Sequence, residues 1–334
     1  MLQGSANFFD TNWFSTDSYD DQSTYHIPFT PLFESVGPFD VNAVSLNGTH
    51  NRYLNQNDKK QSEYNLHSLY GHAMMQHTYN AIHEMVISPK SKLFDKRPFL
   101  VTRSTFTGTG QFASYAIKSK YRTWASLQNA IPHLMTMNMM GFTHSGVDVC
   151  GLIDDKDNAR TTMNEELCLR WIQLATFFPL ARHSQDFSPS SPYVTGPLGF
   201  HDDIKRTAVK LSMRDRMQYL RFMYTCLFES YEYGGTCIDS LIFHFPTDLN
   251  VVNNISMPGV NDTFMFGGAV KVSPIVSEIK DGQKTFKSHF PKGRWVNLAT
   301  LRVLVADSDD LKELPVVEAV TVTKHLRPGY MIPW

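Results

Sequence analysis

The chain has 334 residues, and its 31 Lys and Arg nearly balance its 32 Asp and Glu, giving a formal net charge of -1. Binding to nucleic acid through phosphates needs a basic excess, so the composition argues against a nucleic-acid partner. The hydrophobic fraction of 42% is enough for a large core, whereas the charged fraction of 19% is below the usual value of about 25%. We therefore expect either little surface per residue or a surface that something else covers.

The sequence gives no sign of a membrane span, a signal peptide, or a metal or cofactor site. No run of about 18 apolar residues is present, so we expect no membrane span. Residues 1–7 carry neither a basic region nor an apolar block, so we expect no signal peptide at Met1. The four cysteines form no CxxC pair and the 13 histidines form no HExxH motif, so the sequence implies no metal and no cofactor.

Up to about residue 236, the predicted elements alternate between strands and helices. Residues 1–60 are polar and aromatic and indicate loops around short strands. Apolar spacing of three and four predicts helices over 64–86, 123–140, 164–176 and 212–233, with Thr162 as a possible cap of the third. Short apolar runs at 97–106 and 141–150 predict buried strands that end in polar residues. Such alternation favours a parallel sheet, either open or closed into a barrel.

After residue 236 the pattern changes to short β-rich runs. Strands are predicted over 241–245, 270–276, 303–305 and 316–322, separated by Asn, Asp, Gly and Pro. We therefore predict two domains, 1–236 and 237–334. Because function in parallel α/β folds lies at the carboxyl ends of the strands, Arg103 and Asp148 are the first candidates for a site.

Four motifs occur in one order along the chain: RSTF at 103–106, GVDVCG at 146–151, ELCLRWIQL at 166–174 and FFPLAR at 177–182. Their order and spacing resemble glycoside hydrolase family 31, the α-glucosidase and sucrase-isomaltase group, and the similarity extends from about residue 4 to residue 333. The resemblance implies an α/β fold in which a partial (β/α)8 TIM barrel, from about its third strand onward, precedes a C-terminal β-sandwich. It also implies retaining hydrolysis of α-glucosides by two carboxyl groups about 5–5.5 Å apart.

The resemblance assigns the catalytic and substrate-binding positions one by one. Asp40 stands at the position of the nucleophile, whereas Ser119 stands where the family has the Asp that acts as acid and base. A serine hydroxyl does not donate a proton near neutral pH, so the acid is lost. Arg103 and Asp148 match positions that bind the glucose unit, but Ser184 replaces a sugar-binding His.

Each retained residue also has a structural interpretation. Asp40 could be a loop carboxylate kept by ancestry, and Arg103 and Asp148 could be a buried ion pair or a strand-end pair that stabilises the barrel. Cys150 and Cys168 match a family disulfide, which would form in an oxidising compartment, and we expect Cys226 and Cys237 to be core residues. The family resemblance points to a secretory or lysosomal location.

Three functions follow from these assignments. The first is a catalytically inactive homologue of α-glucosidases that serves as a structural or interaction subunit. The second is an active α-glucosidase, or half of a split one, and the third is a protein that binds α-glucosides through Arg103 and Asp148. Because a barrel needs all its strands to close, we also expect another protein chain, or a preceding piece of the same protein, to cover the incomplete barrel.

Overall fold

A computed structural model of the chain describes residues 69–117, 121–151, 164–183, 200–253, 257, 259–307, 311–316 and 322–333. The chain divides into two compact units, Met1–Phe112 and Ala113–Trp334, which are described in turn. The predicted boundary between residues 236 and 237 stays a prediction. None of the helices in the described ranges combines the length and the apolar character that crossing a membrane requires.

In the first unit, helix α2 (Tyr70–Ile87) packs against the loop that follows strand β1 (Val101–Thr102). A Cβ added at Gly71 would lie 2.6 Å from the carbonyl oxygen of Ser104, so only glycine permits this approach. A short 3-10 helix, η5 (Thr109–Gln111), closes the loop. The hydroxyl of the buried Thr109 donates to the carbonyl of Phe106 at 2.8 Å and accepts from its N–H at 3.0 Å. The helix predicted over 64–86 is confirmed as α2 over its described part.

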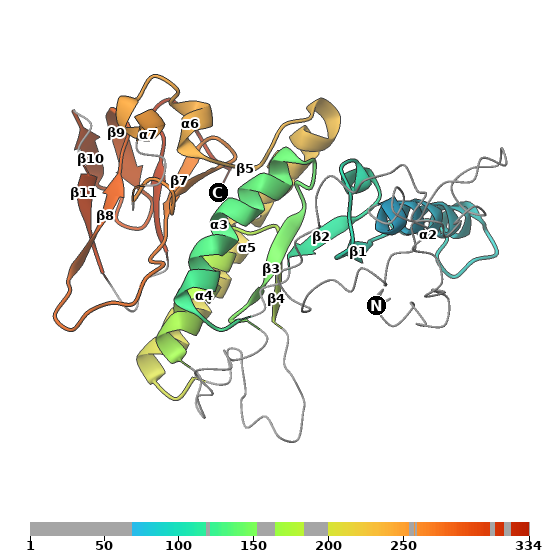
Figure 1. Cartoon of the computed structure of the whole chain (residues 1–334), viewed down its shortest axis with the longest axis horizontal. Helices are drawn as coiled ribbons and strands as arrows, with labels where there is room; N and C mark the ends of the chain where they lie inside the picture. Colours follow the sequence, from blue (N-terminus) through green and yellow to red (C-terminus); the bar gives the residue numbers. More distant parts are fainter. Residues whose placement is uncertain are drawn as a thin grey trace, which may run out of the picture. The chain divides into compact units, whose positions relative to one another are not determined.

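The second unit begins with the predicted alternation of strands and helices. Strands β2 (Ser114–Ile117), β3 (Ser145–Val149) and β4 (Leu180–His183) are parallel neighbours. Between and after them come α3 (Trp124–Met139), α4 (Glu165–Ala175) and α5 (Asp203–Tyr233). Figure 1 shows these helices between the strands and the β-rich C-terminal region. The predicted parallel α/β architecture is confirmed here.

Polar side chains fix the starts of all three helices. Thr123 accepts a hydrogen bond from Ser126 N–H at 3.1 Å, and Asn164 accepts from Leu167 N–H at 3.1 Å. Asp202 accepts from Ile204 N–H at 2.7 Å, so α5 begins nine residues before the predicted position. The first turns of α5 are rich in charged and polar residues and therefore lack the apolar spacing on which the prediction relied. The predicted cap, Thr162, is wrong because Asn164 is the cap.

The C-terminal region of the second unit is built from antiparallel strands. Its larger sheet has the order β10-β9-β12-β7-β6-β5, and β11 pairs with β8 in a second sheet. The strands are β5 (Ile238–Asp239), β6 (Phe264–Phe266), β7 (Val270–Ser273), β8 (Thr285–His289), β9 (Gly293–Asn297), β10 (Val303–Ala306), β11 (Leu311–Pro315) and β12 (Thr323–Leu326). The β domain expected after the barrel part is therefore present.

Two of the individual strand predictions in this region are confirmed and one is wrong. Strands β7 and β10 lie where runs 270–276 and 303–305 predict them. The run 241–245 forms a helix instead, α6 (Leu241–His244), followed by α7 (Leu249–Asn253). The predicted strand 316–322 lies mostly in residues 317–321, outside the described residues.

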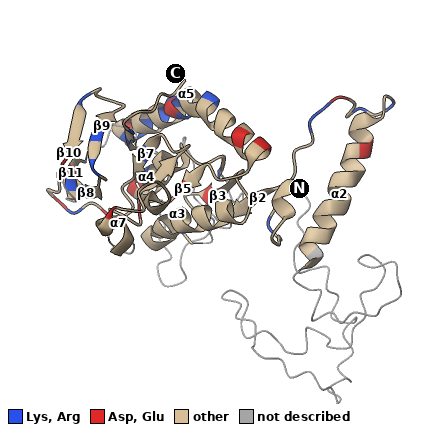
Figure 2. Cartoon of the chain, turned by 90° about the horizontal axis from the view of Figure 1, so that it is seen from above, with Lys and Arg blue, Asp and Glu red and all other residues tan. Residues whose placement is uncertain are grey.

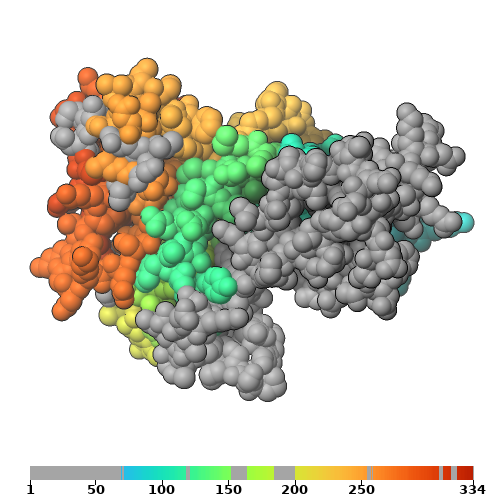
Figure 3. Space-filling model, viewed as in Figure 1, coloured from blue at the N-terminus to red at the C-terminus, as the bar shows by residue number. Residues whose placement is uncertain are grey.

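One aromatic cluster joins the helices to the larger sheet. The ring centroid of Phe177 lies 5.1 Å from that of Tyr219 and 5.5 Å from that of Phe266, and Phe222 meets Phe266 at 5.1 Å. Pairs at these distances contribute about 0.5–1.5 kcal/mol each beyond the area that they bury. Residues on both sides of position 236 thus share one core. Figure 3 shows the barrel part of this unit, in green to yellow, in contact with the C-terminal region, in orange.

The β-rich region encloses a lysine. Lys271 has no exposed area, and its Nζ donates to Ser273 Oγ and Ser288 Oγ at 2.7 Å each. The same Nζ lies 4.1 Å from the ring centroid of Phe290, within range of a cation–π interaction. Burial lowers the pKa of Lys271 to about 7, and the nearby Asp262 opposes this shift in part. The two hydroxyls and the ring are the contacts that the structure shows for the ammonium group, and none of them is a carboxylate.

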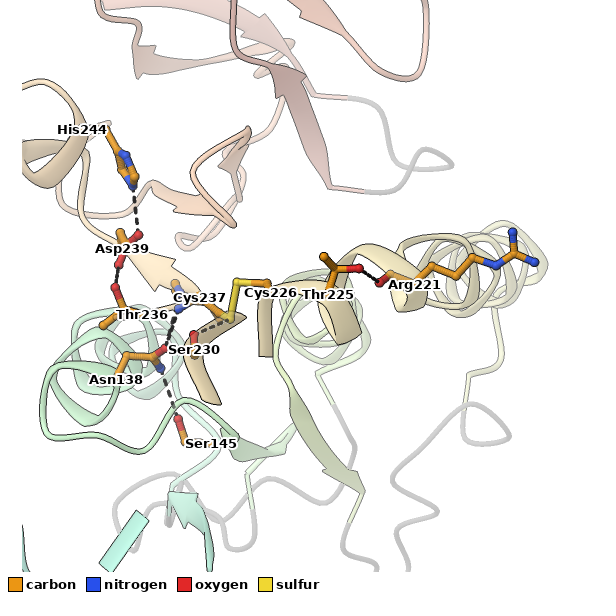
Figure 4. The surroundings of a disulfide bond; sticks show 11 residues. Asn138, Ser145, Arg221, Thr225, Cys226, Ser230, Thr236, Cys237, Asp239 and His244 are labelled. Carbon is orange, nitrogen blue, oxygen red and sulfur yellow. Dashed lines mark hydrogen bonds and ion pairs between the residues drawn. A yellow bond between two sulfur atoms is a disulfide. The ribbon is translucent and has the colours of Figure 1, made fainter. Parts of the chain in front are cut away.

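All four cysteines are paired in two disulfide bonds, Cys150–Cys168 and Cys226–Cys237. The first is the pair that the family resemblance implies. The second corrects our expectation, because Cys226 and Cys237 are buried in the core and are also bonded to each other. Figure 4 shows this bond between the end of α5 and the start of β5, where Asn138 Oδ1 accepts from the N–H of Cys237 at 3.3 Å.

Candidate functional site

The candidate site lies at the carboxyl ends of β3 and β4. In the parallel pairing of these strands, Asp148 is directly opposite Arg182. The guanidinium Nε donates to Asp148 Oδ1 at 2.6 Å, forming an ion pair. The carboxylate is 1% exposed, whereas the Arg182 side chain is 29% exposed. Ligands of parallel α/β folds bind at this edge, so the exposed end of the pair faces the position expected for a ligand.

Close contact between the two strands depends on Gly146. A Cβ at this position would lie 1.4 Å from the carbonyl oxygen of Leu180, a distance that no side chain can adopt. The strand is also fully buried, from Ser145 to Val149. Gly146 therefore sets the spacing at which Asp148 meets Arg182, two residues further along each strand.

The chain turns sharply after β3. Cys150 has φ 67° and Gly151 has φ 74°, both in the left-handed region. This region is costly for a residue other than glycine, and the disulfide from Cys150 to Cys168 in α4 holds the turn. The bond therefore ties the end of the strand that carries Asp148 to the helix behind it.

His183 follows Arg182 at the end of β4. Burial lowers the pKa of His183, so the imidazole is neutral near pH 7. Its Nδ1 is buried and has no hydrogen-bond partner among the described residues. Successive side chains of a strand point to opposite faces of the sheet, so His183 does not lie beside the pair of Asp148 with Arg182. The strand end therefore offers the ion pair alone, which suits hydrogen bonding to hydroxyl groups better than proton transfer between two carboxyls.

The predicted site residues are only partly within the structure. Asp40, Ser119 and Ser184 lie outside the described residues. Arg103 follows β1 in the first unit and is exposed, and its role in substrate binding or in an ion pair stays a prediction. Asp148 forms a strand-end pair with Arg182, a residue that the sequence marks only as part of the FFPLAR motif. No sequence signal identifies Arg182 as the partner of Asp148, because the pairing depends on the register of β3 with β4.

The described residues offer no metal site, since no three His, Cys, Asp or Glu side chains among them converge as a metal ion requires. Strands β2, β3 and β4 together carry one carboxylate, Asp148. Retaining hydrolysis needs two carboxyl groups about 5–5.5 Å apart, so Asp148 and Arg182 by themselves can bind and orient a polar ligand but cannot hydrolyse it.

Two family models match successive parts of the chain. The Glycosyl hydrolases family 31 TIM-barrel domain matches residues 20–226, and the Glycosyl hydrolase family 31 C-terminal domain matches residues 234–332. A parallel α/β barrel part with its site at the strand ends, followed by a β-sheet domain, is the architecture of a barrel-type glycosidase. The chain belongs to glycoside hydrolase family 31.

Similar proteins include several α-glucosidases. The chain is 30% identical over 275 residues to an alpha-glucosidase of Mucor javanicus, a match that covers 81% of the chain and 28% of that relative. It is 28% identical over 297 residues to the lysosomal alpha-glucosidase of Mus musculus, covering 81% of the chain and 27% of the relative. The chain therefore spans about a quarter of the length of these relatives.

Solved structures share the fold at lower identity. A glucosidase II alpha subunit superposes with a TM-score of 0.64 at 20% identity, over 80% of the chain and 26% of the solved one. A GH31 dextranase of Flavobacterium johnsoniae gives a TM-score of 0.65 at 19% identity, over 80% of the chain and 30% of the solved one. These structures confirm the predicted fold class, and the two family models confirm the predicted family.

Proposed function

We propose that this α-glucosidase-like chain does not hydrolyse glycosides and serves as a structural or interaction subunit. The observation that carries the proposal is Ser119 at the position where the family resemblance expects the acid and base. Without a proton donor, an alkoxide leaving group must depart unprotonated, and general acid catalysis of about 10²–10⁴-fold is lost. The pair of Asp148 with Arg182 supports the proposal, because strands β2, β3 and β4 offer no second carboxyl group that could act together with Asp148.

An aryl α-glucoside tests this proposal most stringently. Its phenolate leaving group needs little help from an acid, so a nucleophile alone at Asp40 would still release it in a burst. We expect no release above the rate without protein. Release that is abolished by Asp40→Asn but kept by Asp95→Asn, the same change at an exposed turn, would show an active glucosidase and overturn the proposal.

The same proposal includes a partner. We propose that another polypeptide covers the open side of the barrel part, because the strands of a barrel must close to pair their edges. The low charged fraction of 19% and the match to only about a quarter of the relatives' length support this idea. We expect the native protein to co-purify with a second polypeptide. A stable, monodisperse monomer would contradict the proposed partner.

Binding without hydrolysis is the second candidate, and the strand-end pair favours it. A charged pair that is buried at one end and exposed at the other can donate to and accept from vicinal hydroxyl groups. Isothermal titration with maltose tests this candidate. Saturable binding that weakens about tenfold or more in Asp148→Asn, but not in the exposed control Asp203→Asn, would support a binding role.

A further inference from the structure

Helix α5 carries two separate rows of apolar residues. One row is buried and includes Val209, Tyr219, Phe222 and Met223. The other is exposed, and its members follow one another at intervals of three or four residues, so they lie on one side of the helix. We call it the outer stripe, and it consists of Met213, Met217, Leu220, Tyr224, Phe228 and Tyr231.

The helix cannot turn to bury the outer stripe, because its other side is held in place. Arg216 donates to the carbonyl of Phe178 at 2.6 Å and to that of Pro179 at 2.9 Å, just beyond the end of α4. Asp215 forms an ion pair with Lys324 of β12, and Cys226 is bonded to Cys237. These contacts with α4, β12 and the start of β5 fix the rotation of α5 about its axis.

The outer stripe is too regular to be incidental exposure. Single apolar side chains on a surface are common, but a continuous row marks an interaction surface. From Met213 to Tyr231 the stripe extends about 27 Å at 1.5 Å per residue. Met217 is 68% exposed and Tyr231 is 83% exposed, so large side chains project fully from the helix. Figure 2 shows that α5 also carries acidic and basic residues.

The barrel architecture identifies what covers the stripe. In a (β/α)8 barrel each helix packs on the strands and between the helices on either side of it. α5 is the last helix of the part that matches the family's barrel model, and its buried side already contacts α4. The next position around a closed barrel belongs to the strand–helix units that open it.

We propose that the outer stripe of α5 is the docking surface for the opening strand–helix units of a family 31 barrel, contributed by polypeptide outside residues 1–334. This inference rests on the partner in the proposed function and identifies where that partner binds. The occupant is an amphipathic helix with its strand, because a row of Met, Leu, Tyr and Phe needs an apolar helix or strand face of similar length. Residues 1–68 of this chain and a second copy of it are the competing occupants.

Site-specific photo-cross-linking tests the proposal. The probe is the part of the Mucor javanicus alpha-glucosidase that precedes the region matched by this chain, co-expressed as a separate fragment with the full 334-residue chain. Benzoylphenylalanine at Met217 or Tyr224 is expected to cross-link to the fragment. The matched control is Thr225, which neighbours Tyr224 on α5 and is exposed off the stripe (Figure 4). It is expected not to cross-link.

Charge substitutions provide the second measurement. The double variant Met217→Glu, Tyr224→Glu is expected to lower recovery of the fragment about tenfold or more, while Thr225→Glu leaves it unchanged. Both variants alter exposed positions, so far-ultraviolet circular dichroism and the urea midpoint should match those of the parent. Cross-links to residues 1–68, cross-links to a second copy, or no capture at Met217 and Tyr224 would each overturn the proposal. Because no hydrolysis is measured, the outcome is independent of whether the chain is an active glucosidase.

Discussion

The end of β3 and the interior of the β-rich region each bury an ionisable side chain, but they compensate its charge differently. Asp148 has an opposite charge at 2.6 Å, and the partner Arg182 extends toward the surface. Lys271 is surrounded by two serine hydroxyls and an aromatic ring and has no exposed area. The first arrangement can exchange hydrogen bonds with a ligand, whereas the second is closed to ligands. Burial of charge thus points to binding in one region and to folding in the other.

The largest effect is expected where the strands of the first region meet. Gly146→Ala places a Cβ 1.4 Å from the carbonyl oxygen of Leu180, so β3 and β4 must separate. We expect the free energy of unfolding to fall by more than about 4 kcal/mol, or the chain to accumulate as insoluble protein. Urea unfolding and soluble yield measure this. Gly146 has no positive φ, so its loss comes from the contact, and Gly282→Ala, at a turn where a Cβ meets nothing within 4 Å, is the control without such a contact.

A smaller loss is expected when the ion pair is broken. Arg182→Met removes the guanidinium and leaves a carboxylate that is 1% exposed, which should cost about 3 kcal/mol of unfolding free energy. Adding Asp148→Asn removes the charge as well and should recover most of the loss. Urea denaturation of both variants at pH 7 tests this, and equal stabilities would mean that the charge of Asp148 is compensated elsewhere.

The smallest effect at neutral pH, and the clearest contrast with the first region, is expected at Lys271. Its folded pKa of about 7 lies below the ordinary value of 10.5, so the unfolded chain binds more protons between these values. Stability should therefore rise between pH 7 and pH 9, by about 1 kcal/mol per pH unit from this group, with Asp262 and His325 as its charged or titratable neighbours.

Replacement of this lysine separates its contribution from that of other groups. Lys271→Met should be neutral or stabilising by about 1 kcal/mol at pH 7 and should remove the rise with pH. Lys287→Met, at an exposed lysine on β8 in the second sheet, should retain the rise. Urea unfolding at pH 7, 8 and 9 provides the test, and an unchanged slope in Lys271→Met would contradict the assignment.

Local pattern predicted the helices of the barrel part and strand β3, but it did not predict strands β2 and β4. Contacts between distant residues decided the remainder. Helix α3 and strand β3 lie where apolar spacing places them. The run 241–245 became a helix because Leu241, Ile242 and Phe245 pack inward while Phe243 is 57% exposed. A short apolar run does not distinguish a strand from a buried helix.

The candidate site shows the same division between local and distant information. Asp148 was predictable because it ends a buried apolar run and lies in a family motif. Its partner Arg182 lies 34 residues away, and the pairing depends on the register of β3 with β4, which no local pattern specifies. The bond between Cys226 and Cys237 depends in the same way on how α5 turns into β5.

The bond between Cys226 and Cys237 closes a loop across the junction of α5 and β5. This loop contains the last turns of α5 and the two glycines at 234 and 235, both with positive φ. A protease that cut the backbone within residues 227–236 would leave the two pieces of the chain covalently joined. The nicked protein would migrate as one band before reduction and as two bands after it.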